Sequence, residues 1–327
     1  MKIGFLHGKE NDMTLQMGNQ LRDCLSPHEV LLWPEGETPP CEDLDVLLVS
    51  GAVTSVQLES QPKLGLIQTT STGYETVDLA AANRLGIWVS YAPSDLTGNA
   101  TSVAEFAVLL LLGASRQLGR VIDSDGRGTA APRLHSALNG KTVCIVGLGS
   151  IGLQVAERLR AFGMLLLATD EHPEHAPAGV TAFAADKLLV AVADADFIII
   201  CVRASAENQN LISAAVIAGM KRGAVIVNVA RGMLVDEDAL CAALESGHIA
   251  AVGLDVVRHE PLEAANRLLT FPQALITPHM AALTDIMISG TAGFISRVIA
   301  EYEASVRFPS LLNSPDHPRK TLTQCPT

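Results

Sequence analysis

The sequence predicts an α/β protein with two doubly wound parallel-sheet domains, and three observations lead to this prediction. The chain has 327 residues, more than one hydrophobic core usually supports, so two domains are expected. Short β-branched or leucine-rich runs alternate with alanine-rich stretches, which is the pattern of a parallel sheet covered by helices on both faces. A glycine-rich turn joins such a run to such a stretch at residues 147–152, and this arrangement is typical of nucleotide binding.

The first half of the chain contains a series of candidate strands, each ending in or followed by Gly, Pro, Ser or Thr. They are residues 2–8, 30–33, 45–51, 65–73 and 86–93. A long apolar helix is expected over residues 101–120, with Thr101 or Ser102 as its N-cap. Its run "AVLLLLGA" is compatible with burial in a core or in an interface. After a polar linker over 121–140, a second series of strands and helices runs to about Ala282.

Composition narrows the possible functions. Hydrophobic residues make up 48% and charged residues 18%, and no apolar run is long enough to cross a membrane. The net charge of −12 disfavours a nucleic-acid surface, because neutralising phosphates requires clustered Lys and Arg. The N-terminus lacks the apolar stretch of a secretory signal, so a cytoplasmic location with reduced thiols is expected. The cysteines, which have no zinc-like spacing, are Cys24, Cys41, Cys144, Cys201, Cys241 and Cys325.

Gly147, Gly149 and Gly152 form a G-x-G-x-x-G motif between an apolar strand and an amphipathic helix. The first glycine allows a tight turn, the second lets the main chain approach a pyrophosphate, and the third lets helix and strand pack closely. Amides at the start of the helix then face the phosphates. The motif predicts a dinucleotide site in this context, and a structural glycine turn is the alternative.

The next apolar run ends at Asp170, where a carboxylate can accept hydrogen bonds from both ribose hydroxyls of NAD. A 2′-phosphate would be repelled there, and Glu171 rather than an arginine follows. NAD is therefore the expected cofactor, unless Asp170 is an incidental surface residue.

Three later strands end in conspicuous polar residues, namely Arg231, Asp255 followed by Glu260, and His279. Ligands of an open parallel sheet bind beyond the carboxyl ends of its strands, so we expect these side chains to meet. Each has an ordinary alternative: Arg231 could form a surface ion pair, Glu260 could cap a turn, and His279 could be a core histidine. Together, beside a dinucleotide fold, they indicate a hydride-transfer site.

At this point the sequence resembles the D-isomer-specific 2-hydroxyacid dehydrogenase family over about residues 45–282. The motifs that carry the resemblance are "STGYETVDLAAANRLGIWVS", "TSVAEFAVLLLLGASR", "VGLGSIG", "NVARGMLVDEDALCAALESGHIAAVGLDV", "HEPL" and "TPHMA". The resemblance implies an enzyme that interconverts a small 2-keto acid and its D-2-hydroxy acid, similar to glyoxylate/hydroxypyruvate reductases or phosphoglycerate dehydrogenases. It also implies a homodimer built partly by the helix near Thr101.

The resemblance further implies the roles of individual residues. Arg231 would bind the substrate carboxylate and polarise the keto oxygen, His279 would be the acid and base, and Glu260 would orient and charge His279. Main-chain amides near Thr72 and Gly73 would also bind the substrate carboxylate. The cofactor-binding positions would be Thr101, Gly147, Gly149, Ser150, Ile151, Gly152, Asp170, Cys201, Val202, Val229, Ala230 and Asp255, the last of which would hold the nicotinamide carboxamide.

The domain organisation that the resemblance implies is discontinuous. Residues 1–98 and 289–327 would form a flavodoxin-like catalytic domain, into which a Rossmann-like NAD-binding domain of residues 99–288 is inserted. Glu75-Thr76 and Val257 are among the departures from the family pattern, so the substrate side chain is left open.

Two other functions remain as alternatives. A phosphite dehydrogenase-like oxidoreductase is disfavoured because Thr72 stands where that branch has a lysine. An NAD-sensing, corepressor-like binding protein would keep the Arg231, Glu260 and His279 trio, and turnover of NADH with a 2-keto acid would exclude it. The segment "DEHPEH" places His172 and His175 near acids, but in a proline-containing loop we expect ordinary solvent exposure and no metal.

Overall fold

The computed structural model describes residues 1–8, 12–121 and 134–324. Cys325 and residues 122–133 of the expected linker lie outside the described residues. The chain divides into two compact units, residues 1–99 with 283–327 and residues 100–282. The expected boundary between the domains was 288/289. In the structure the chain returns to the first unit at residue 283, just before the helix that begins at Asp285.

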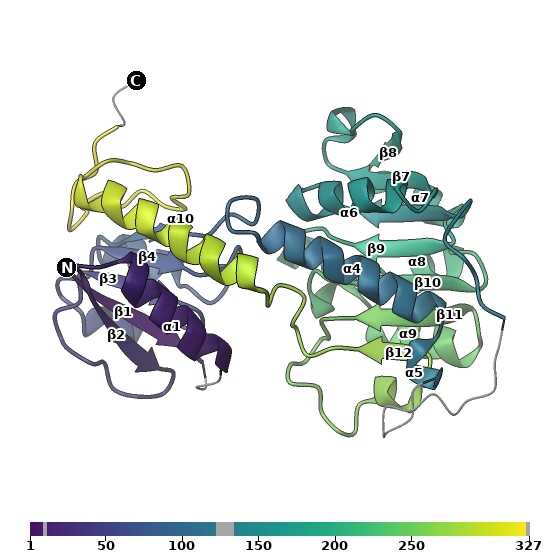
Figure 1. Cartoon of the computed structure of the whole chain (residues 1–327), viewed down its shortest axis with the longest axis horizontal. Helices are drawn as coiled ribbons and strands as arrows, with labels where there is room; N and C mark the ends of the chain where they lie inside the picture. The colour runs from purple at the N-terminus through teal and green to yellow at the C-terminus, as the bar shows by residue number, and fades with distance from the viewer. Residues whose placement is uncertain (9–11, 122–133, 325–327) are drawn as a thin grey trace. The chain divides into compact units, whose positions relative to one another are not determined.

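The first unit is built on a five-stranded parallel sheet in the order β2-β1-β3-β4-β5. Figure 1 shows β1 to β4 of this sheet beside α1 and α10. The strands are β1 (Lys2–His7), β2 (Glu29–Pro34), β3 (Val46–Val49), β4 (Leu66–Thr69) and β5 (Trp88–Ser90). Helices α1 (Asp12–Cys24) and α10 (Asp285–Glu303) share one hydrophobic core with the sheet, and α2 (Ser55–Glu59) and α3 (Leu79–Arg84) share a second core. This strand order with helices on both faces is that of flavodoxin-like folds.

The second unit has a seven-stranded parallel sheet in the order β12-β11-β10-β9-β6-β7-β8. The strands are β6 (Thr142–Val146), β7 (Leu165–Asp170), β8 (Val180–Ala184), β9 (Phe197–Ile200), β10 (Ala224–Asn228), β11 (Ile249–Leu254) and β12 (Ala274–Ile276). The order extends the 3-2-1-4-5-6 order of dinucleotide-binding sheets by one strand. The chain reverses its direction of travel between β6 and β9, and that reversal opens a crevice at their carboxyl ends. The predicted pair of doubly wound parallel sheets is therefore confirmed.

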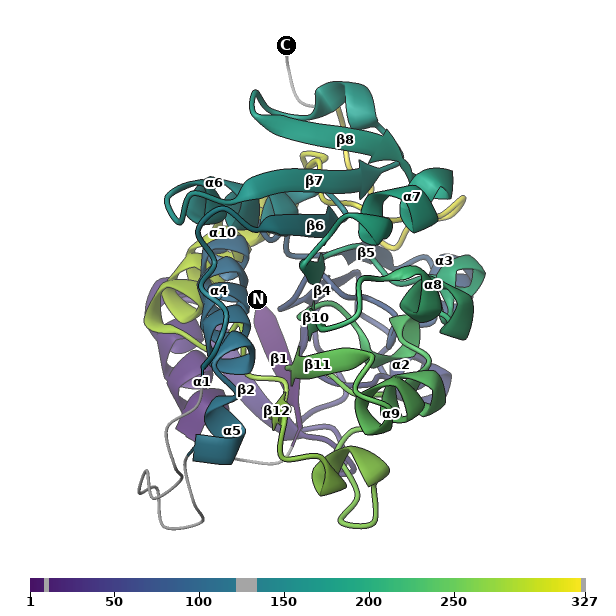
Figure 2. The ribbon, with the colours of Figure 1, turned by 90° about the vertical axis from the view of Figure 1, so that its right-hand side faces the viewer.

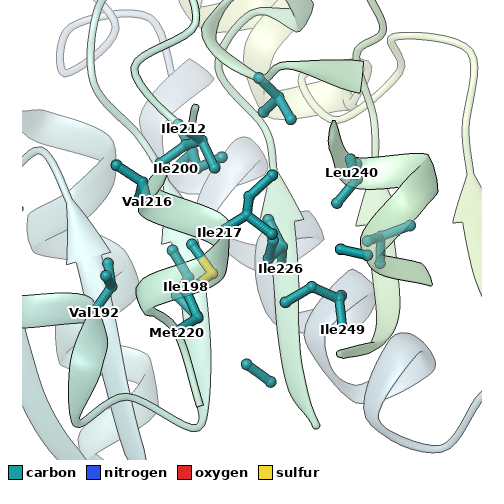
Figure 3. Close-up of a cluster of buried hydrophobic side chains, with 14 of the residues drawn as sticks. Val192, Ile198, Ile200, Ile212, Val216, Ile217, Met220, Ile226, Leu240 and Ile249 are labelled. Carbon is teal, nitrogen blue, oxygen red and sulfur yellow. The ribbon is translucent and has the colours of Figure 1, made fainter. Parts of the chain in front are cut away.

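Helices cover both faces of the second sheet, as Figure 2 shows. Those on one face are α4 (Asn99–Ser115) and α6 (Ser150–Arg160), and those on the other are α7 (Leu188–Ala193), α8 (Ala214–Gly219) and α9 (Glu237–Glu245). Figure 3 shows part of the second face, where Ile198, Ile200 and Ile226 of the sheet pack against Ile217 and Leu240 of the helices. These β-branched and leucine side chains are nearly all fully buried, so the strands read as continuous apolar runs.

The helix expected at Thr101 differs at both ends. It begins at Asn99, so Thr101 and Ser102 lie inside its first turn and neither is the N-cap. It ends at Ser115, because Gln117 has a positive φ of 47° that interrupts the helix before α5 (Leu118–Val121). Among the described residues, no helix is long and apolar enough to span a membrane. The cysteines that the structure describes all carry free thiols.

Candidate active site

The glycine turn between β6 and α6 has the space and the main-chain geometry that a pyrophosphate requires. Gly147 has a φ of 98°, and a Cβ there would lie 2.7 Å from Cα of Val202. A Cβ on Gly152 would lie 2.0 Å from the oxygen of Gly147, so this position tolerates no side chain. By contrast, no atom lies within 4 Å of the Cβ position of Gly149, which is the N-cap of α6. The open space at a helix N-terminus fits the phosphates of a dinucleotide.

Asp170 ends β7 and joins the glycine turn to the following loop. One carboxylate oxygen accepts from the amide of Leu148 over 2.7 Å, and the other accepts from the amide of His172 over 2.9 Å. Each oxygen has a second lone pair, so the carboxylate can still accept hydrogen bonds from two ribose hydroxyls. These acceptor oxygens fit the ribose hydroxyls in the adenosine half of NAD.

The other expected cofactor positions lie in the second unit, in α4 and α6 or directly after β9, β10 and β11. Ser150 and Ile151 begin α6, and Thr101 in α4 donates to the side chain of Gln154 in α6 over 3.2 Å. Cys201 directly follows β9, and burial raises the pKa of its thiol to about 12. The thiol of Cys201 therefore stays protonated at neutral pH. Val229 and Ala230 follow β10 in the same way that Cys201 follows β9.

Asp255, at the end of β11, is 2% exposed and organises the turn that carries His279. Its carboxylate accepts from the hydroxyl of Thr277 over 2.7 Å and from the amides of Met280 and Ala281 over 2.9 Å each. The main-chain oxygen of Asp255 accepts from the amide of His279 over 2.8 Å. His279 has a φ of 52°. This left-handed conformation is uncommon outside glycine, and the carboxylate that fastens both flanks of the turn holds it.

Glu260 and His279 form a direct pair. Oε2 of Glu260 lies 2.7 Å from Nδ1 of His279, and Oε1 accepts from the amide of Val257 over 3.2 Å. Burial raises the pKa of Glu260, but the hydrogen bond and charge of His279, the Val257 amide and the charge of Arg231 outweigh it and leave that pKa below its ordinary value. Within the described part of the chain, Nε2 of His279 has no partner, so this nitrogen can exchange a proton with a ligand.

Arg231 follows β10, and the buried side chain of Asn228 fixes its main chain. Nδ2 of Asn228 donates to the oxygen of Arg231 over 2.9 Å, and Oδ1 accepts from the amide of Ala230 over 3.0 Å. The guanidinium donates to the oxygen of Ala230 over 2.8 Å, and as far as the described residues go most of its other donors are left for a ligand. The role of Asn228 was not predicted, although a single carboxamide in an otherwise apolar strand is the sequence signal that marks such a residue.

The turn after Arg231 presses against the loop that leads to Glu260. A Cβ on Gly232 would lie 2.0 Å from both the carbonyl carbon and the carbonyl oxygen of Val257, so only glycine fits. The Arg231 and Glu260 segments therefore share one tight main-chain contact.

Arg258 fastens the same loop to its surroundings. Its amide donates to the carboxylate of Glu237 at the start of α9. Its guanidinium donates to Oδ1 of Asn210 over 2.8 Å and to the oxygen of Val235 over 3.2 Å. No local pattern in the sequence marks these residues, because their partners are far apart in the chain.

A pocket of about 300 Å³ lies beside the Glu260 and His279 pair. Apart from polar groups of the pair and its neighbours, its walls are largely apolar and include Val257, Leu262, Leu269 and Ile276. Thr72 and Gly73, the remaining expected site residues, lie in the first unit, in the loop after β4. There the hydroxyl of Thr72 donates to the oxygen of Ala92 over 3.1 Å, and the oxygen of Gly73 accepts from Ser71.

The fold and this site define a dinucleotide-binding α/β protein that gathers an arginine, a glutamate and a histidine at strand ends. A family model described as "D-isomer specific 2-hydroxyacid dehydrogenase, NAD binding domain" matches residues 108–281. The chain belongs to this family, and the resemblance found in the sequence is confirmed.

Named relatives agree on the family and differ in substrate. D-3-phosphoglycerate dehydrogenase from Mycobacterium leprae is 40% identical over 250 residues, which cover 74% of this chain and 46% of that protein. This chain thus spans less than half the length of that relative. Glyoxylate reductase from Thermococcus kodakarensis is 33% identical over 87% of this chain and 90% of that protein. The crystal structure of an NADPH-dependent glyoxylate/hydroxypyruvate reductase from Sinorhizobium meliloti superposes with a TM-score of 0.81 at 28% identity, over 95% of this chain and 98% of that chain.

Proposed function

We propose that the protein is an NAD-dependent oxidoreductase that interconverts a small 2-keto acid and its D-2-hydroxy acid. The observation that carries the proposal is the 2.7 Å contact between Glu260 and His279, with Arg231 close enough to lower the pKa of Glu260. These groups follow strands of the unit that holds the dinucleotide motif.

Arg231 is the proposed binder of the substrate carboxylate. A guanidinium is planar and always charged, so it can grip a carboxylate through two parallel hydrogen bonds. The same group also stabilises negative charge on the keto oxygen as the carbonyl is reduced. Main-chain amides near Thr72 and Gly73 are proposed to complete this anion site.

His279 is the proposed acid and base. In the reducing direction, Nε2 gives its proton to the forming alkoxide, and in the oxidising direction it takes the proton back. Glu260 holds Nδ1, which fixes the orientation of the ring and favours its protonated form. Glu260 acts through His279, so it is a positioning residue.

The proposed cofactor is NAD, held by Gly147, Gly149, Ser150, Ile151 and Gly152, with Asp170 at the adenosine ribose and Asp255 at the carboxamide. When bound, the cofactor supplies or accepts a hydride at the carbon that carries the substrate oxygen. The carboxylates of Asp170 and Glu171 support NAD over NADP, although the relative from Sinorhizobium meliloti is NADPH-dependent by its description.

Initial rates of NADH oxidation with glyoxylate, hydroxypyruvate, pyruvate and phenylpyruvate test the proposal. We expect turnover of at least one acid, and the relatives make glyoxylate and hydroxypyruvate the first choices. A protein that binds NADH but turns over none of these acids would contradict the proposal and favour a binding function. If the protein reduces 3-phosphohydroxypyruvate and none of the smaller acids, the result would instead favour a phosphoglycerate dehydrogenase activity.

We also propose that the first unit, residues 1–99 with 283–327, is the catalytic domain and that the protein is a homodimer. The dimer proposal is supported by an exposed leucine on α4, Leu109, which is 54% exposed. A monomer mass by light scattering at micromolar concentration would contradict the dimer. The cytoplasmic location stays a prediction from the sequence.

A further inference from the structure

The loop that follows Asp170 brings together side chains of the types that bind metal ions. Among the described residues, one group of three His, Cys, Asp or Glu side chains offers ligand atoms that all lie within 4.8 Å of one another. The group consists of His172, Glu174 and His175. We propose that these side chains bind one divalent cation of the zinc class, and that this cation is linked to dinucleotide binding through Asp170.

The local main chain explains why side chains of such close spacing converge. Pro173–His175 is a 3₁₀ turn, η1, and residues three apart in a 3₁₀ turn eclipse one another. The rings of His172 and His175 accordingly stack, with centroids 5.5 Å apart and an angle of 28° between their planes. Oε1 of Glu174 lies 3.2 Å from Nδ1 of His172 and 4.0 Å from Nε2 of His175. The spacing of these residues in the sequence would not bring the three side chains together without the 3₁₀ turn.

The turn is held at both of its ends. Pro173 has a restricted φ, and the amide of His175 donates to the oxygen of His172 over 3.0 Å. Upstream, the amide of His172 donates to Asp170, and downstream the oxygen of Ala178 accepts from Arg160 over 2.7 Å. The main chain that carries the ligands is therefore already ordered, so less conformational entropy is lost when a cation binds.

The chemistry of the donors favours zinc-class ions over calcium or magnesium. Two imidazoles and a carboxylate form an open site, with the fourth position left to water, that suits Zn²⁺, Co²⁺ or Ni²⁺. The hard ions Ca²⁺ and Mg²⁺ prefer all-oxygen ligands. The side chains are 62–77% exposed, so a cation can enter from solvent.

The link to the nucleotide rests on the proposed function, which places the adenosine ribose on Asp170. The same carboxylate accepts from the amide of His172, so a cation ligand lies two residues from the ribose site. A bound cation would add positive charge where NADPH carries its 2′-phosphate and NADH carries a hydroxyl. We therefore expect Zn²⁺ to strengthen NADPH binding relative to NADH by about threefold, the size of a screened interaction between double charges ~10 Å apart.

Cation binding is tested first, on the full chain without cofactor. Zn²⁺ is titrated against a chromophoric chelator, and Co²⁺ spectra report whether nitrogen and oxygen or thiolate ligands are bound. We expect one cation per chain without a thiolate charge-transfer band. Because loss of a supporting group already weakens metal sites by about 10–100-fold, His175→Gln and His172→Gln should each weaken binding at least that much. The matched control, His317→Gln, changes an exposed histidine of the other unit and should bind as the wild type does.

Equal Zn²⁺ affinity of the His175→Gln and wild-type proteins, or thiolate-type Co²⁺ spectra, would overturn the site. The linkage is then measured from the Kd values of NADH and NADPH with and without Zn²⁺, using His175→Gln to correct for zinc bound by the nucleotide itself. An unchanged ratio of the two Kd values would overturn the linkage. Failure of both nucleotides to bind would overturn the proposed function instead, while the cofactor-free titration still decides the cation site.

Discussion

The side chain of Asn228 holds the main chain of Arg231, with Nδ2 donating to the Arg231 oxygen over 2.9 Å. Asn228 is 1% exposed and also accepts from the amide of Ala230, so its carboxamide shapes the turn that presents the guanidinium. Asn228 thereby places Arg231 through hydrogen bonds to the main chain.

Asn228→Ala should both destabilise the protein and lower kcat/KM. The substitution leaves the amide of Ala230 and the oxygen of Arg231 without their partner, which costs about 1–3 kcal/mol when such groups are buried. Denaturant unfolding and steady-state kinetics measure the two effects. Asn19→Ala, at an exposed helical position, should stay within ~0.5 kcal/mol of the wild type. Wild-type values of both quantities for Asn228→Ala would contradict the role of this side chain.

Arg231→Lys should raise KM and lower kcat together. Lysine keeps the positive charge but loses the planar fork that holds a carboxylate and a developing alkoxide at once. The kinetics are measured with the best 2-keto acid, after melting temperature and NADH affinity are shown to be unchanged. If Arg231 were a structural surface residue, the variant would instead show normal kinetics and a lower melting temperature.

His279→Ala should lower kcat by about 10²–10⁴-fold, the usual contribution of general acid catalysis. NADH affinity should change little, because the proposed cofactor contacts lie on other residues. Single-turnover reduction with NADH bound beforehand separates the chemical step from binding. A wild-type rate in that measurement would rule out His279 as the proton donor.

Glu260→Gln should leave measurable activity but change its dependence on pH. Without the carboxylate the protonated ring of His279 is less stable, so in the reducing direction activity should be lost at lower pH than in the wild type. A profile of kcat/KM against pH checks this shift. A uniform loss at every pH would show that Glu260 has a structural role alone.

The same variant changes how stability depends on pH. The pKa of Glu260 in the folded protein lies below its ordinary value, so the ionised carboxylate stabilises the fold at neutral pH. That contribution is lost as pH falls through the ordinary carboxyl range toward the lowered pKa. The stability difference between wild type and Glu260→Gln should therefore shrink on acidification, as followed by denaturant unfolding at several pH values.

NADH should be preferred to NADPH when no divalent cation is present, because Asp170 and Glu171 place negative charge at the expected 2′-phosphate position. Asp170→Ala should narrow the ratio of the two kcat/KM values, since it removes one of these charges. Both measurements are made with a chelator in the buffer. A clear preference of the wild-type protein for NADPH would contradict the cofactor assignment.

The parts of the site that could be predicted from sequence are those with a local pattern. Gly147 and Gly152 have no room for a Cβ, while Gly149 leaves open space at the start of α6. Arg231, Glu260 and His279 follow apolar strands that end at one edge of a sheet. The parallel sheets were predictable for the same reason, because strands buried on both faces are continuous apolar runs.

What the sequence did not show depends on how the main chain bends or on distant partners. Thr101 was predicted to be the N-cap, but the helix starts at Asn99. Several neighbouring polar residues can cap a helix, and the sequence does not show which of them precedes the first helical residue. Arg258 contacts Asn210 and Val235 from far along the chain, so no local pattern announces it. The meeting of His172 with His175 requires a 3₁₀ turn that their spacing alone does not specify.

The contact between Gly232 and Val257 bears on how such an enzyme could be redesigned. Since the peptides of the two segments touch with no room for a methyl group, neither backbone can be reshaped without displacing the other. The adjoining pocket would therefore have to be reshaped by exchanging side chains, with Leu262 and Leu269 as starting points. The stretch from residue 228 to residue 260 is best transplanted whole.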